Sequence, residues 1–110
     1  MHLFIELWSP KAAWGDLNQE QRGAFISKVA GAISRFDDEI EAIGWGDTDM
    51  EIDASAPQKY FAVWRAKSRE AVKGMTELLR ELDWYVYFDQ SNVVGLSETP
   101  DAVIARMIAL

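Results

Sequence analysis

Four stretches of the sequence carry the pattern of a β-strand, and their order along the chain constrains the fold more than any other feature. In the first, residues 2–8, the side chains alternate between two faces, as they do in a strand. Two further patterns cover residues 41–47 and 59–67. The last is the aromatic run 84–89, which reads Trp-Tyr-Val-Tyr-Phe-Asp. We therefore predict four strands.

Helix signals separate these strands. Asn18 is a good N-cap, and Gln21 follows it at the spacing of a capping box. Apolar residues then recur every three to four positions until about residue 38, which predicts an amphipathic helix. A second amphipathic helix is predicted over residues 68–82, and Thr-Pro at positions 99 and 100 begins a short third one.

The order strand, helix, strand, strand, helix, strand predicts a ferredoxin-like βαββαβ fold of the α+β class. In this fold the four strands form an antiparallel sheet, with the two helices on one face. The short C-terminal helix follows the last strand. A chain of 110 residues has the length of one domain, so we expect a single domain over residues 1–110.

The alternation also assigns residues to the two faces of the sheet. We predict that the helix-covered face carries Leu3, Ile5, Leu7, Ala62, Trp64, Trp84, Val86 and Phe88. The uncovered face then carries Phe4, Glu6, Trp8, Phe61, Val63, Arg65, Tyr85 and Tyr87. So many large rings are unfavourable in contact with water. We therefore expect a sheet-to-sheet homodimer that buries them.

Charge and composition narrow the classes of partner. The formal charge is −7, from 18 acidic and 11 basic residues, which opposes binding to nucleic acid or to an anionic membrane. The chain has no cysteine, so it has no disulfide framework, thiolate metal site or thiol nucleophile. The first residues lack the pattern of a secretion signal. We expect a cytoplasmic protein with neither a nucleic-acid nor a membrane partner.

The strand residues resemble a known group of proteins. The runs Leu3–Trp8, Phe61–Trp64 and Trp84–Gly95 resemble the dimeric α+β barrel superfamily, and within it an uncharacterised bacterial branch. This ferredoxin-like superfamily includes cofactor-independent monooxygenases, haem-degrading enzymes and muconolactone isomerase. The resemblance implies a homodimer with a cavity between or above the two sheets. It implies no particular activity, because members differ in their chemistry.

Glu6 is the candidate catalytic residue. It lies between Phe4 and Trp8 on one face of a strand, where desolvation is expected to raise the pKa of its carboxyl group and suit it to proton transfer. In this topology the first and third strands are neighbours, which would bring Arg65 within reach. The alternative is that Glu6 and Arg65 form an ion pair with no role in function.

The candidate ligand-binding residues are Phe4, Trp8, Arg65, Tyr85, Tyr87 and Asn92. The two tyrosines would offer hydroxyl groups to an oxygen-bearing ligand or an enolate, or alternatively pack at the dimer interface. Monooxygenases that this chain resembles hold phenolic substrates with Asn, Trp, Tyr and His, types present here as Asn92, Trp8, Tyr87 and His2. The alternative role of Asn92 is to form a turn.

The residue types and spacings in the sequence do not match a metal-binding or a nucleotide-binding site. His2 is the only histidine, and one histidine does not build the usual zinc site; haem ligation by His2 is disfavoured by its place at the chain terminus. The acidic run 47–58 lacks the glycine and glutamate of a calcium loop. Gly44-Trp45-Gly46 lacks the third glycine of a dinucleotide turn. We expect no metal and no cofactor.

Two hypotheses follow from these observations. In the first, a homodimer binds a small aromatic or apolar molecule in a cavity lined by the sheet, as a cofactor-free oxidoreductase or isomerase in which Glu6 transfers a proton. In the second, the protein is not catalytic and uses the same sheet face only for assembly. An open cavity beside Glu6 favours the first hypothesis, and dense packing there favours the second.

Overall fold

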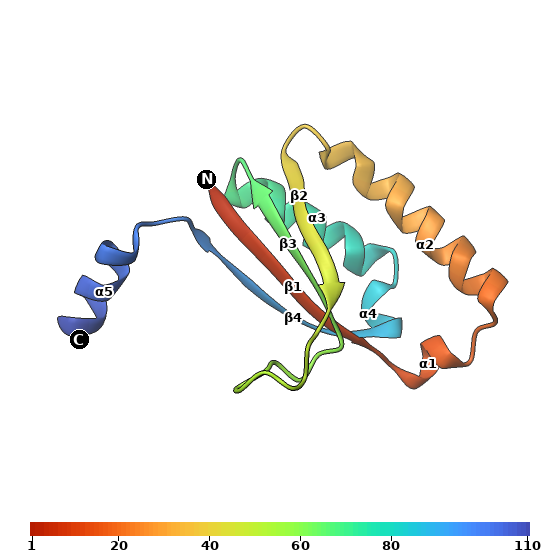
Figure 1. Cartoon of the computed structure of the whole chain (residues 1–110). Coiled ribbons are helices and arrows are strands. Elements are labelled where there is room, and N and C mark those ends of the chain that lie inside the picture. Colours follow the sequence, from red (N-terminus) through yellow and green to blue (C-terminus); the bar gives the residue numbers. More distant parts are fainter.

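The computed structural model describes all 110 residues, Met1–Leu110, and is shown in Figure 1. Its elements in chain order are β1 (His2–Pro10), α1 (Ala12–Gly15), α2 (Gln19–Ile33), a 3₁₀ turn η1 (Ser34–Phe36), β2 (Ile40–Asp47), β3 (Tyr60–Ala66), α3 (Arg69–Glu81), α4 (Trp84–Tyr87), β4 (Phe88–Leu96) and α5 (Pro100–Ile108).

The four strands form one antiparallel sheet in the order β2-β3-β1-β4. The helices α2 and α3 both lie on one side of it (Figure 1), and residues of both helices contact the same face. This is the predicted ferredoxin-like α+β architecture. The prediction of fold class is confirmed, and β1 lies in the middle of the sheet, between β3 and β4.

Both long helices begin where their capping residues predict. Oδ1 of Asn18 accepts from the backbone N–H of Gln21 at 2.8 Å. Oε1 of Gln21 accepts from the backbone N–H of Asn18 at 2.9 Å, which completes the capping box. Ser68 accepts from the backbone N–H of Ala71 at 3.1 Å. The two helices are buried to different extents: α3 buries five residues against the sheet, but α2 buries only Val29. A gap is therefore left beneath α2.

The predicted strand over residues 84–89 is wrong. Residues Trp84–Tyr87 form the single helical turn α4, and the strand begins only at Phe88. Asp83 precedes the turn with φ 66°, a left-handed conformation that Asp tolerates better than most residues. It reverses the chain after α3, so Trp84 is buried while Val86 is 52% exposed.

The predicted faces of β1 are also wrong. Phe4 lies opposite Trp64, and Glu6 lies opposite Ala62; directly paired residues share a face, and all four are buried beneath the helices. Leu3, Ile5 and Leu7 therefore point to the uncovered face. The assignment of β3 was right, since its covered side chains include Ala62 and Trp64.

A group of side chains on the uncovered side of the sheet will be called the bare face. It follows from the register of the four strands. Its apolar members are Leu3, Ile5, Leu7, Phe61, Val63 and Val93. Arg65 lies on the same face and pairs with Glu41 of β2, with 3.4 Å between Nη1 and Oε2. The bare face is thus apolar with a charged border.

Strand β2 contains a bulge at Ile43. Ala42 pairs with Trp64, and the next paired residue, Gly44, lies opposite Val63. One extra residue therefore stands in β2 against its neighbour. Beyond the bulge, Trp45 pairs with Ala62 and so lies on the helix-covered side of the sheet.

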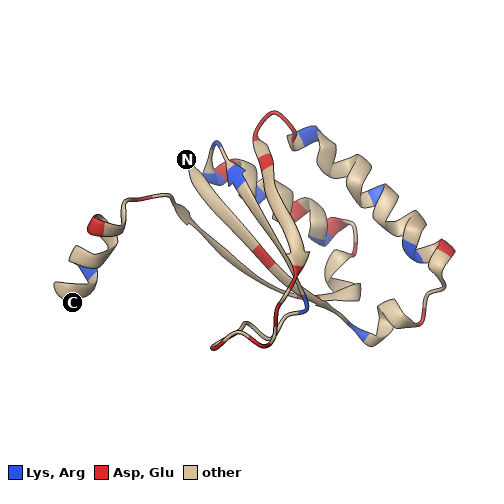
Figure 2. Ribbon diagram, viewed as in Figure 1, with Lys and Arg blue, Asp and Glu red and all other residues tan.

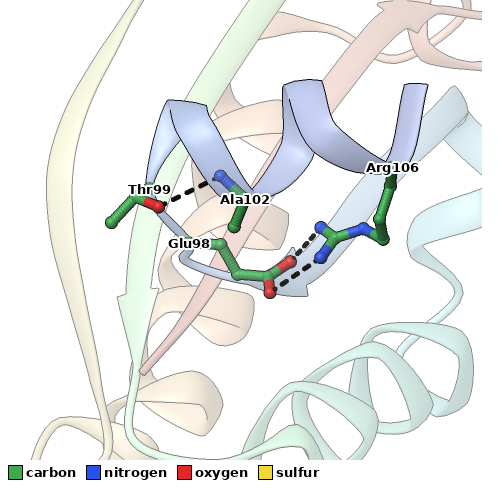
Figure 3. A network of polar contacts seen from close by, with 4 residues as sticks. All are labelled: Glu98, Thr99, Ala102 and Arg106. Carbon is green, nitrogen blue, oxygen red and sulfur yellow. Dashed lines mark hydrogen bonds and ion pairs between the residues drawn. The ribbon is translucent and has the colours of Figure 1, made fainter. Parts of the chain in front are cut away.

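The C-terminal helix α5 stands apart from the rest of the chain (Figure 1). As predicted, Thr99 is its N-cap and accepts from the N–H of Ala102 at 3.2 Å, with Pro100 in the first turn. The guanidinium of Arg106 donates to both carboxylate oxygens of Glu98 (Figure 3). We call residues 97–110 the C-terminal arm.

Charged residues fall mainly on the helices and in the connections, and few fall on the strands (Figure 2). The connection between β2 and β3 contains Asp49, Glu51 and Asp53. None of the helices has the length and apolar character needed to span a membrane.

Candidate functional site

A pocket lies in the gap between the sheet, α2 and α3. The space within it that the centre of a water molecule can occupy is about 100 Å³. Its mouth includes Ile26, 42% exposed, and Trp45, 57% exposed. Its walls are Glu6, Trp8, Ile26, Val29, Ala30, Ile33, Trp45, Trp64, Met75, Leu79 and Trp84. We call this cavity the Glu6 pocket, because Glu6 is its one polar wall residue.

Glu6 is the only buried charged residue, with 4% of its surface exposed. Its carboxylate accepts two hydrogen bonds, one at each oxygen. Nε1 of Trp64 donates to Oε1 at 2.7 Å, and Nε2 of Gln90 donates to Oε2 at 2.6 Å. These charge-assisted bonds offset part of the cost of burying the group.

A second tryptophan fixes the orientation of Gln90. Nε1 of Trp84 donates to Oε1 of Gln90 at 2.7 Å. Because an indole nitrogen is only a donor, the amide oxygen of Gln90 must face Trp84 and its amide nitrogen must face Glu6. The same nitrogen also donates to Oδ1 of Asn92 at 2.8 Å. We call Glu6, Trp64, Gln90 and Trp84 the Glu6 network.

Burial raises the pKa of Glu6 above its ordinary value, because the charged form loses its hydration. The hydrogen bonds from Gln90 and Trp64 act in the opposite direction and stabilise the carboxylate. Both hydrogen-bond partners of Glu6, Trp64 and Gln90, donate to its carboxylate, and neither accepts from it. The geometry therefore suits a carboxylate that accepts a proton from a molecule in the pocket.

Tyr85 and Asn92 lie beside the network. Burial and the negative charge of Glu6 raise the pKa of the Tyr85 hydroxyl, while Asn92 and Arg80 lower it. Asn92 pairs directly with Glu6 across β1 and β4. It is a strand residue, so the alternative reading of Asn92 as a turn residue is wrong.

The other predicted site residues divide between the pocket and places away from it. Trp8 lines the pocket, and Phe4 is fully buried on the same face of β1. Tyr87 packs against Trp14 and Phe25, with ring centroids 5.6 Å and 4.9 Å away. The predicted contact between Arg65 and Glu6 is absent, because Arg65 lies on the bare face, paired with Glu41, and does not line the pocket.

Sequence reasoning missed three residues that define the site: Gln90 and Trp64, which donate to Glu6, and Trp84, which donates to Gln90. A signal for the first existed, since an alternating strand through residues 88–96 places Gln90 and Asn92 on one face. For Trp64, the assignment of Glu6 to the opposite face hid the contact. Four of the five tryptophans line the Glu6 pocket.

The structure contains no group of three or more His, Cys, Asp or Glu side chains placed to hold a metal ion. His2 is the first residue of β1, opposite Ala66 and Leu96, and is not part of the pocket wall. Asp49, Glu51 and Asp53 are exposed in the connection that precedes β3.

Solved structures with the same fold include chlorite dismutases. A mutant of the enzyme from Candidatus Nitrospira defluvii matches with a TM-score of 0.70 and 13% identity, over 94% of this chain and 43% of that one. The structure of that enzyme in complex with imidazole matches with a TM-score of 0.68 and 15% identity, over 90% and 40%. At this identity the likeness shows the fold alone. The chain spans about 40% of the chlorite dismutase chain.

Comparison by sequence gives a narrower result. No curated protein matches the chain. The sequence profile of one family, described as a family of unknown function (DUF6616), matches residues 1–110. The match covers the whole described structure, including the sheet, the Glu6 pocket and the C-terminal arm. The chain therefore belongs to the DUF6616 family.

Proposed function

We propose that the protein binds a small aromatic or apolar molecule in the Glu6 pocket, and that Glu6 transfers a proton to or from it. The observation that carries this proposal is one buried carboxylate in a pocket whose ten other wall residues are hydrophobic. An inward charge in such a wall is costly. Its cost is understandable if the charge acts on the bound molecule.

The size of the pocket suggests the size of the ligand. An apolar cavity of about 150 Å³ is large enough to bind benzene, so a space of about 100 Å³ with an open mouth favours a single ring or a short chain. Imidazole, present in one of the chlorite dismutase structures, is a molecule of this size. Indole rings of Trp8, Trp64 and Trp84 would surround the ligand.

The chemistry that suits this arrangement is removal of a proton from carbon or from a phenol. Glu6 would act as the base, and the substrate would need to stabilise its own anion, as in a cofactor-free oxidoreductase or isomerase. Among the other candidate residues, Tyr85 and Asn92 lie on the polar side of Glu6 and would orient it. Phe4 and Trp8 would shape the apolar side.

Binding can be tested by tryptophan fluorescence, since four indoles line the pocket. Phenol and toluene serve as probes, and we expect saturable quenching at millimolar concentration. Ala30→Phe adds a ring at the pocket wall and should weaken binding by about tenfold or more. Ala24→Phe, at an exposed position of the same helix, is the matched control. Equal quenching in both variants would exclude the pocket as the binding site.

Proton transfer requires a second test. Once a substrate has been found by turnover of phenolic and enolisable compounds, Glu6→Gln should abolish turnover while quenching by the same compound persists. If Glu6→Gln turns over the substrate at the wild-type rate, the carboxylate has only a structural role.

A homodimer through the bare face forms part of the proposal. The helices α2 and α3 lie on the opposite side of the sheet (Figure 1), so they do not cover the apolar residues of the bare face; most of these are half-buried, and Val93 is 58% exposed. The same observation favours the second hypothesis, a non-catalytic assembly protein. That hypothesis predicts a dimer whose Glu6 pocket binds no probe. We also propose a cytoplasmic location and membership of a bacterial branch of the dimeric α+β barrel superfamily.

A further inference from the structure

The C-terminal helix α5 has an apolar stripe that contacts no other part of its own chain body. Val103, Ile104, Met107 and Ile108 are spaced to share one face of the helix. They are 42%, 49%, 69% and 80% exposed, and α5 has no buried residue. A helix that packed on its own sheet would bury such a stripe.

A helix as short as α5 needs a surface to pack on. It has nine residues, and isolated helices of fewer than about 12 residues are only marginally stable in water. The Glu98–Arg106 ion pair (Figure 3) is exposed, so it contributes little, and the Thr99 cap satisfies only one backbone N–H of the first turn. The apolar stripe must supply most of the stabilisation by packing against another surface.

The arm leaves the chain body at a fixed point. The backbone N–H of Ser97 donates to the carbonyl of Met1 at 3.0 Å, which holds the end of β4 to the start of β1. Beyond that point α5 extends away from the sheet (Figure 1). The radius of gyration is 15.9 Å, compared with about 13 Å for a compact domain of this length.

The exposed area of the chain is that of one half of an assembly. A compact monomer of this mass exposes about 6,200 Å², whereas this chain exposes 7492 Å². The excess, about 1,300 Å², exceeds the roughly 800 Å² that each partner buries in a standard interface. The two apolar surfaces without cover, the bare face and the α5 stripe, are the parts of the chain suited to bury it.

We propose that α5 of each copy docks on the second copy, so that the homodimer exchanges its C-terminal arms. This inference rests on the proposed homodimer and assigns it a second contact beside the bare face. Each copy carries a formal charge of −7, so association must rely on apolar contact, as the α5 stripe provides. Screening of the mutual repulsion by salt should strengthen the dimer.

The absence of cysteine from the chain allows a direct test. Ile104→Cys places one thiol on the α5 stripe, and Ala24→Cys places one at an exposed position of α2 as the control. Each variant is reacted with a maleimide across a dilution series, while analytical ultracentrifugation follows the dimer. We expect Ile104→Cys to react about tenfold more slowly as dimer than as monomer, and Ala24→Cys to react at one rate throughout.

A second variant separates exchange from folding back. Val93→Asp puts a charge on the bare face at an exposed edge-strand position, and should give a folded monomer in which Ile104→Cys reacts fast at every concentration. Slow reaction in that monomer would mean that α5 packs on its own chain, and would overturn the inference. Fast reaction in a wild-type-like dimer would overturn it too, while the bare-face dimer survives. If the protein without the Val93→Asp substitution is a monomer at all concentrations, both the arm exchange and the proposed bare-face dimer are refuted.

Discussion

The indole of Trp64 on β3 donates to Glu6 on β1 across a diagonal of the sheet, with 2.7 Å between Nε1 and Oε1. The residue directly opposite Glu6 is Ala62, whose small side chain leaves room for the indole to reach across. Diagonal neighbours lie within reach of aromatic side chains. Two neighbouring residues of β3 thus accommodate the buried carboxylate: Ala62 leaves the space for it, and Trp64 donates a hydrogen bond to it.

The first prediction concerns the donor. Trp64→Phe keeps an aromatic ring but leaves Oε1 of Glu6 without its partner, which should cost about 2 kcal/mol of unfolding free energy when Glu6 is ionised. The loss should be smaller near pH 4, where more of the carboxyl is protonated. Urea unfolding at both pH values measures it.

The matched control is Trp45→Phe, at a tryptophan that lines the same pocket but is 57% exposed and lies outside the Glu6 network. The loss of unfolding free energy in Trp45→Phe should be smaller than in Trp64→Phe and independent of pH. If the loss in Trp64→Phe is also independent of pH, ring packing rather than the hydrogen bond causes it.

The second prediction concerns the pH dependence of stability. The pKa of Glu6 is raised in the folded state from its ordinary value of 4.5, so the folded protein binds this proton more tightly than the unfolded chain does. The stability that protonation provides is fully present below pH 4.5 and is lost as pH rises through the folded pKa.

Glu6→Gln removes this dependence. The free energy of unfolding of the wild type, minus that of Glu6→Gln, should therefore decrease as pH rises from about 4 to 8. The amide leaves one donor of the network without an acceptor, which adds an offset that does not vary with pH. A difference that rises with pH would show that the hydrogen bonds outweigh desolvation and that the pKa is lowered.

The sequence predicted the elements with regular periods and clear caps, and it failed where two periods coincide. Positions 84 and 88 share a face in a strand, where the period is two, and in a helical turn, where residues four apart are neighbours. Alternation alone therefore did not distinguish α4 from a strand. The left-handed Asp83, which decides between them, has no signature in the pattern.

The assignment of β1 failed for a different reason. Both of its faces are apolar in sequence, one through Leu and Ile and the other through Phe and Trp, so alternation does not say which face meets the helices. Glu6 appeared to favour the open face. Its place inside depends on Trp64 and Gln90, which are 58 and 84 residues away along the chain, and only the register of the sheet brings them together.

The third prediction compares two glycines of β2. A Cβ atom at Gly46 would lie 2.8 Å from Cζ of Phe61, whereas nothing lies within 4 Å of a Cβ at Gly44. Gly46→Ala must displace the Phe61 ring on the bare face and should cost about 1 kcal/mol. Gly44→Ala should have no measurable cost. Thermal unfolding of the two variants checks this, and equal melting temperatures would mean that the ring moves freely.

The fourth prediction compares two helix caps of the same chemistry. Ser68→Ala removes the cap of α3, which packs on the sheet through five buried residues, and should cost about 1 kcal/mol of global stability. Thr99→Ala removes the cap of α5, which buries none. In a monomer it should leave the main unfolding transition unchanged and reduce only helicity, as circular dichroism would report. If Thr99→Ala lowered the stability of the main unfolding transition as much as Ser68→Ala does, α5 would unfold cooperatively with the rest of the domain.

The bulge at Ile43 decides which side of the molecule receives Trp45. Because neighbouring strand positions point in opposite directions, each residue inserted or removed reverses the parity of everything beyond it. If Ile43 paired with Val63 without a bulge, Gly44 would lie opposite Ala62 at the mouth of the Glu6 pocket, and Trp45 would lie opposite Phe61 and point outward. The single unpaired residue of this edge strand, Ile43, thus keeps an indole in the wall of the Glu6 pocket, where the shifted register would leave a groove open to solvent.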